Sequence, residues 1–118
     1  IKSSDIKKFI ESNPNTVLLD VRTEEEWNKI GKPDTKNFKI KSFFITISQD
    51  PSFLDNVKKN INKKDQVLVM CAAGGRSIIA ANLLKNEGFN VLNISDGFSG
   101  NGEDPGWKNL GLPSIINI

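Results

Sequence analysis

The chain contains a single cysteine, Cys71, placed where a thiol could act as a nucleophile. Arg76 follows it, and the four residues between them are all alanine or glycine. A thiol reacts as its thiolate, and a helix N-terminus, converging N–H groups and a nearby cation favour that ionised form. The arginine could donate to the thiolate or bind an anionic substrate with its planar guanidinium. The spacing favours a reactive thiol in an anion-binding loop over its alternative, an inert cysteine at the end of a core strand.

Two predicted elements would position this loop. Residues 67–70 are a short apolar run, the pattern of a strand buried on both faces. Residues 77–87 carry apolar side chains at helical spacing, and Gly88 follows where a helix usually ends. The loop between them opens into the helix, so its unpaired amides would point inward. The candidate substrate-binding residues are therefore Ala72, Ala73, Gly74, Gly75, Arg76 and Ser77.

A second strand is expected over residues 16–21, and it ends in polar residues. Asp20 would lie at the carboxyl edge of a parallel sheet, where open α/β folds bind ligands. Arg22 and Arg76 are the only arginines among 16 basic residues. Thr23 and Glu26 have the spacing of a helix capping box, which is a sufficient structural explanation for this glutamate. The pattern gives Glu26 no direct catalytic role.

Composition limits the possible functions. A chain of 118 residues has room for one domain, predicted over residues 1–118. The net charge of +2 gives no electrostatic case for binding nucleic acid. The chain has no histidine, which removes His-based acid–base catalysis and most zinc sites, and a single cysteine excludes an internal disulfide. No segment approaches the ~20 apolar residues of a membrane span. We expect a cytoplasmic protein, or a periplasmic one if a signal peptide has been removed before Ile1.

Four blocks in order along the chain resemble the rhodanese-like domains. Cys71-x-x-Gly-x-Arg-Ser after the apolar run resembles the active-site loop of that family, and residues 17–27 (VLLDVRTEEEW) resemble its amino-terminal signature. Residues 96–98 and 106–113 resemble its carboxy-terminal signatures. The block around Gly31 keeps this glycine and Pro33 but lacks the histidine that most members carry there.

The resemblance implies an α/β fold with a five-stranded parallel sheet flanked by helices on both faces. It also implies a sulfurtransferase in which Cys71 takes a sulfane sulfur from thiosulfate or a persulfide donor and carries it as a persulfide. A thiol, a protein acceptor or cyanide then removes that sulfur. Such an enzyme requires no metal or organic cofactor. In rhodanese-like domains the residues matching Asp20 and Arg22 mostly support the loop, and we expect the same role here.

Two other functions stay open. A phosphatase or arsenate reductase of the related cysteine-loop type has five residues between the cysteine and the arginine, whereas this chain has four. That tighter ring suits one sulfur atom better than a phosphoryl group. The other alternative is a non-catalytic module of the same fold that carries sulfur for a partner or binds one. Inactive members commonly lose the cysteine, whereas this chain keeps both Cys71 and Arg76.

Overall fold

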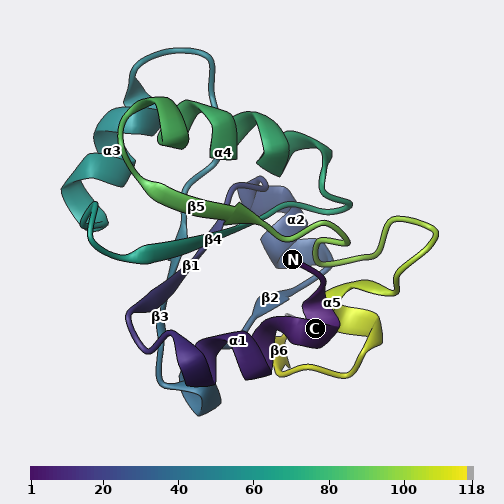
Figure 1. Ribbon diagram of the computed structural model, residues 1–118. Coiled ribbons are helices and arrows are strands. Elements are labelled where there is room, and N and C mark those ends of the chain that lie inside the picture. Colours follow the sequence, from purple (N-terminus) through teal and green to yellow (C-terminus); the bar gives the residue numbers. More distant parts are fainter. Residues whose placement is uncertain (117–118) are drawn as a thin grey trace.

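A parallel β-sheet forms the centre of the computed structural model, which describes residues 1–116; residues 117–118 of the predicted domain lie outside the described part. The strand order is β3-β1-β4-β5, and all three pairings are parallel (Figure 1). Leu19 in β1 is paired with Phe43 in β3 on one side and with Val69 in β4 on the other. The strands are β1 Thr16–Asp20, β3 Lys41–Phe44, β4 Gln66–Met70 and β5 Asn90–Asn93.

The parallel α/β architecture is confirmed, but the sheet has four strands among the described residues rather than the expected five. The two remaining extended pieces, β2 (Lys32–Pro33) and β6 (Ser114–Ile115), pair with each other in antiparallel orientation. Each is only two residues long, and the proline in β2 has no N–H to donate to a ladder. These pieces therefore form a separate small ribbon instead of extending the sheet.

Helices cover both faces of the sheet. Figure 1 shows α3 and α4 together on one side and α1 on the other. Helix α1 ends at Ser12, and Asn13 leaves the helical conformation because a residue before proline disfavours it. The helices are α1 Ile6–Ser12, α2 Glu24–Lys29, α3 Ser52–Asn60, α4 Gly75–Asn86 and α5 Gly106–Asn109, with short 3₁₀ turns at Ser3–Asp5 and Lys36–Phe38.

The strand side chains divide the core into two layers. In β4, Val67 and Val69 pack with the buried faces of α3 and α4, whereas Leu68 and Met70 pack with α1 and Trp107 of α5. This is the alternation that a strand imposes, and it explains why a central strand is apolar throughout. Side chains on both faces of β4 are buried, so the strand cannot shift along its neighbours without exposing apolar groups. Cys71 follows β4 directly, and this packing therefore positions it.

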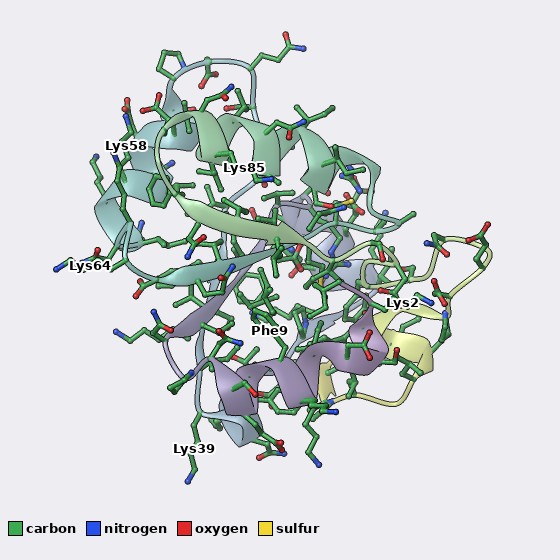
Figure 2. The ribbon with its side chains drawn as sticks, in the orientation of Figure 1. Lys2, Phe9, Lys39, Lys58, Lys64 and Lys85 are labelled. Atoms are coloured by element: carbon green, nitrogen blue, oxygen red, sulfur yellow. The ribbon has the colours of Figure 1, made fainter. Side chains whose placement is uncertain are left out.

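The lysines lie on the surface. Figure 2 shows Lys39 and Lys64 pointing away from the ribbon, and both side chains are exposed. No helix within residues 1–116 combines the length and the apolar character needed to cross a bilayer.

Candidate active site

The Cys71 thiol lies at the carboxyl end of β4 and faces the start of α4. Its Sγ accepts hydrogen bonds from the Gly74 N–H at 3.1 Å and from the Ser77 hydroxyl at 3.3 Å. The helix begins at Gly75, two residues before the predicted start at Ser77. This earlier start brings the first helical turn, with its unpaired N–H groups, up to the sulfur.

These donors change the ionisation of the thiol. Burial alone would raise the pKa of Cys71, because only 1% of the residue is exposed. Hydrogen bonds from the Ser77 hydroxyl and from the N–H groups of Ser77, Ala73 and Gly74 favour the thiolate and outweigh this effect. The net result is a Cys71 pKa below its ordinary value, which is the condition for a nucleophilic thiol.

The loop owes its shape to close backbone contacts with residues 95–99. Gly74 has a φ of +99°, and a Cβ at this position would collide with the Ser95 carbonyl. Gly97 has a φ of +59°, and a Cβ there would collide with the carbonyls of Cys71 and Ala72. The Phe98 N–H also donates to the Cys71 carbonyl at 2.9 Å. Only glycine fits at these two approaches, since it tolerates positive φ and has no side chain.

Arg76 does not hydrogen-bond to the Cys71 sulfur but makes a two-point contact with Glu26. Nη1 lies 2.6 Å from Oε1 and Nη2 lies 2.8 Å from Oε2. This contact, more than any other cause, holds the pKa of Glu26 at about 2, well below its ordinary 4.5, and also raises the pKa of Arg76. The charges of Cys71 and Asp20 act on Arg76 through space as smaller effects. The predicted role of Arg76 in binding substrate stays a prediction, and in the structure its two Nη atoms are paired with a carboxylate.

Sequence reasoning missed this role of Glu26. The predicted capping box is confirmed, since the Thr23 hydroxyl accepts from the Glu26 N–H and the Glu26 carboxylate accepts from the Thr23 N–H. The structure shows where this second role comes from, because β1 pairs directly with β4 in parallel orientation. Their carboxyl ends are neighbours, so the residues after Asp20 must approach the residues after Met70.

The second arginine is buried beneath this region. Arg22 Nη2 lies 2.8 Å from Asp20 Oδ2, and both side chains have 0% exposure. Arg22 Nε lies 3.0 Å from Asp20 Oδ1, and Nη2 also donates to the Gly31 carbonyl at 2.9 Å. The guanidinium stacks on the Phe98 ring at 4.3 Å, and Phe98 in turn binds the Cys71 carbonyl through its N–H. The pair thus contacts the loop through Phe98.

The remaining predicted loop residues have different surroundings. Ala73 and Gly75 are exposed and Ala72 is half-buried, whereas Gly74 and Ser77 are buried against the sulfur. Nothing lies within 4 Å of the position that a Cβ on Gly75 would occupy, so the loop is open there. The structure thus brings Ala73, Gly74 and Ser77 to the thiol, and leaves Ala72 and Gly75 on its rim.

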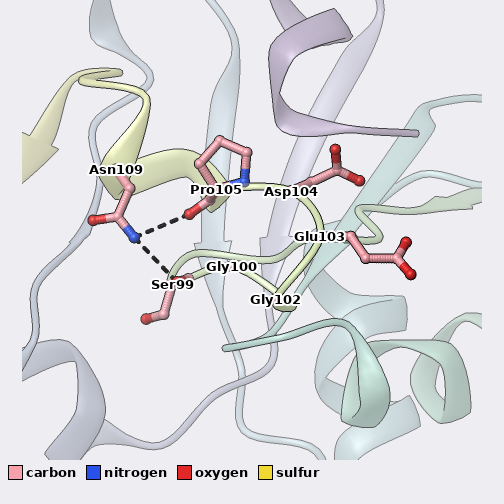
Figure 3. A pocket seen from close by; sticks show the side chains of 7 residues that line it. All are labelled: Ser99, Gly100, Gly102, Glu103, Asp104, Pro105 and Asn109. Atoms are coloured by element: carbon pink, nitrogen blue, oxygen red, sulfur yellow. Dashed lines mark hydrogen bonds between the residues drawn. The ribbon is translucent and has the colours of Figure 1, made fainter.

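Two of the cavities in the structure differ in their relation to the predicted site residues. A groove of about 430 Å³ is lined by Arg76, by Ile79 and Leu83 of α4, and by residues 47–49. A second cavity, of about 380 Å³, lies between the loop after β5 and α5, where Asn109 donates to the Ser99 and Pro105 carbonyls (Figure 3). The second cavity contains none of the predicted site residues, so the groove at Arg76 is the one that adjoins the candidate chemistry.

Comparisons with known proteins agree with this fold. A family model described as the STR4 middle domain matches residues 3–117. The uncharacterized protein RP600 of Rickettsia prowazekii is 45% identical over 104 residues, covering 86% of this chain and 84% of its own length. Thiosulfate sulfurtransferase 16, chloroplastic, of Arabidopsis thaliana is 34% identical over 98 residues, with coverage of 81% and 77%.

Solved structures give the same result. The crystal structure of Rv0390 from M. tuberculosis superposes with a TM-score of 0.84 at 28% identity, covering 98% of this chain and 95% of the other. The polysulfide-sulfur transferase homodimer from Wolinella succinogenes gives a TM-score of 0.74 at 25% identity, with coverage of 98% and 77%. The fold and these similarities define a rhodanese-like domain. Within that class, the chain belongs to the family described as the STR4 middle domain.

Proposed function

We propose that this chain is a sulfurtransferase that carries a sulfane sulfur on Cys71. The observation that carries the proposal is the Cys71 sulfur at the start of α4, receiving hydrogen bonds from Gly74 N–H and the Ser77 hydroxyl. The rhodanese-like relatives support it, since they include proteins named as sulfurtransferases. A single domain over residues 1–118 and a cytoplasmic location stay predictions.

The proposed reaction has two displacement steps. The Cys71 thiolate attacks the sulfane sulfur of a donor, forms a new S–S bond, and the electron pair of the broken bond leaves with sulfite or a thiolate. An acceptor then attacks the outer sulfur of the Cys71 persulfide. A cyanide acceptor leaves as thiocyanate and a thiolate acceptor leaves as a persulfide, and Cys71 returns as the thiolate. Splitting the transfer in this way is covalent catalysis by an activated nucleophile.

The loop would stabilise the charge that moves during both steps. The N–H groups of Ala73, Gly74 and Ser77 and the Ser77 hydroxyl already favour the thiolate. The same donors would favour the anionic outer sulfur of the persulfide, because they are fixed in place by α4 and by the contact with residues 95–99. Asp20 and Arg22 would act as positioning residues through Phe98.

The test is intact-mass spectrometry of the reduced chain after incubation with thiosulfate and, separately, with a small-molecule persulfide. We expect a gain of one sulfur atom that cyanide removes, and no gain in Cys71→Ser. Because the chain has one cysteine, no second thiol can carry the label. If the reduced chain gains sulfur from neither donor, the sulfurtransferase proposal is wrong and a non-catalytic interaction module takes its place.

A further inference from the structure

The contact between Glu26 and Arg76 has a consequence for the choice of sulfur donor. Arg76 is the one charged residue within the loop from Cys71 to Ser77, and its guanidinium is the natural partner for an anionic donor. In the structure both of its Nη atoms are within 2.8 Å of a Glu26 carboxylate oxygen. An incoming anion would have to compete with a carboxylate that already fills the fork.

Glu26 is held in place independently of Arg76. Its carboxylate accepts from the Thr23 N–H at 3.3 Å and from the Thr23 hydroxyl at 3.1 Å, within the first turn of α2. Only 22% of its side chain is exposed, so solvent screens the contact less than it would on an open surface. A carboxylate fixed by its own helix binds the arginine without losing side-chain freedom, which strengthens the pair. Glu26 is therefore a built-in anion at the rim of the loop.

The net charge at the rim is consequently close to zero. A dianion such as thiosulfate gains little there beyond the loop amides, and it also meets the negative charge of Glu26. A persulfide carries at most one charge on its sulfur and has an organic group. The groove that Arg76 shares with Ile47, Ile79 and Leu83 is an apolar surface for such a group, and Ile79 is 59% exposed.

We propose that Glu26, by occupying Arg76, is a specificity-determining residue that favours organic persulfides over thiosulfate as the sulfur donor. This inference rests on the proposed function. It assigns Glu26 a positioning role through Arg76, distinct from its role in the helix cap.

The test compares Glu26→Gln with Glu25→Gln, which removes the same charge one residue earlier on α2. Glu25 is 72% exposed and pairs with Lys29 rather than with the loop. Glutamine also satisfies a capping box, so Glu26→Gln keeps the helix start while removing the charge. Both changes are made in the Cys71→Ser chain, and thiosulfate binding is measured by calorimetry, so the readout needs no turnover.

We expect Glu26→Gln to bind thiosulfate about fivefold more tightly or better, because charged hydrogen bonds from the freed Arg76 become available. Glu25→Gln should bind like its parent. Adding Arg76→Met should remove the gain, which shows that Glu26 acts through this arginine. In the chain that retains Cys71, Glu26→Gln should raise thiosulfate turnover relative to turnover with the persulfide of 2-mercaptoethanol.

Equal or weaker thiosulfate binding in Glu26→Gln would overturn the inference, as would a gain that persists without Arg76. The proposed function fails by a different observation, the absence of a Cys71 persulfide from either donor. If the chain never forms the persulfide but Glu26→Gln still binds thiosulfate more tightly, the sulfurtransferase proposal is wrong. Glu26 then remains a determinant of anion binding.

Discussion

Both arginines make a two-point contact with a carboxylate, Arg22 through Nε and Nη2 and Arg76 through its two Nη atoms, but their surroundings differ. Arg22 and Asp20 are two residues apart in sequence, and both have 0% side-chain exposure. Arg76 and Glu26 come from separate elements, and 40% and 22% of their side chains are exposed. The buried pair contacts the loop through Phe98, whereas the more exposed pair joins Arg76, at the start of α4, to Glu26 of α2. The comparison separates a pair buried in the fold from a pair that the substrate would meet under the proposed function.

Removing Arg22 should have the largest effect on stability. Arg22→Met leaves Asp20 buried without its cation, and breaking a buried pair from one side costs about 3–5 kcal/mol. The matched control is Lys29→Met, which breaks an exposed pair with Glu25 and should change the free energy of unfolding by about 0.5 kcal/mol or less. Urea denaturation measures both. If Arg22→Met costs no more than Lys29→Met, the buried pair does not have the role assigned to it.

Gly74 and Gly75 test whether the stability of the loop depends on its close backbone packing as well as on the two arginine–carboxylate pairs. Gly74→Ala forces a side chain into positive φ and into the Ser95 carbonyl, and should cost at least about 2 kcal/mol. Gly75→Ala lies at the first residue of α4 with open space around it, and should be neutral or stabilise by up to about 1 kcal/mol. Thermal unfolding of the two variants measures the difference. Similar melting temperatures would contradict the close packing of this loop.

The Glu26–Arg76 pair should contribute less to the free energy of unfolding than the buried pair, and its contribution should depend on pH. The pKa of Glu26 falls from its ordinary 4.5 to about 2 in the fold, so its carboxylate stabilises the folded state above pH 4.5. This contribution is lost as the pH falls from 4.5 towards 2. After allowance for solvent screening we expect Glu26→Gln to cost about 1 kcal/mol near neutral pH. Urea titrations at several pH values should show the difference from the parent shrinking over that window; a constant difference would contradict the pairing.

The sequence predicted the parts of the site that follow from local pattern. The apolar run before Cys71, the helix after it and the Thr23–Glu26 cap are all local signals, and each matches an element of the structure. The Glu26–Arg76 contact joins residues 50 positions apart, and the cap already accounted for the glutamate. The sheet has four strands rather than the expected five, and the short segment β2 pairs with β6 instead of with the sheet. A segment of two residues that contains a proline is too short for its sequence pattern to predict its pairing partner.

The central claim is that the loop lowers the pKa of the Cys71 thiol, and ultraviolet titration tests it most directly. The chain has one cysteine and no tyrosine, so the absorbance of a thiolate reports Cys71 without interference from tyrosinate. We predict a midpoint below that of a free cysteine thiol, because hydrogen bonds from the loop lower the pKa of Cys71, and a higher midpoint in Ser77→Ala, which removes one of those donors. A midpoint at or above that of free cysteine would show that burial dominates and would contradict the account.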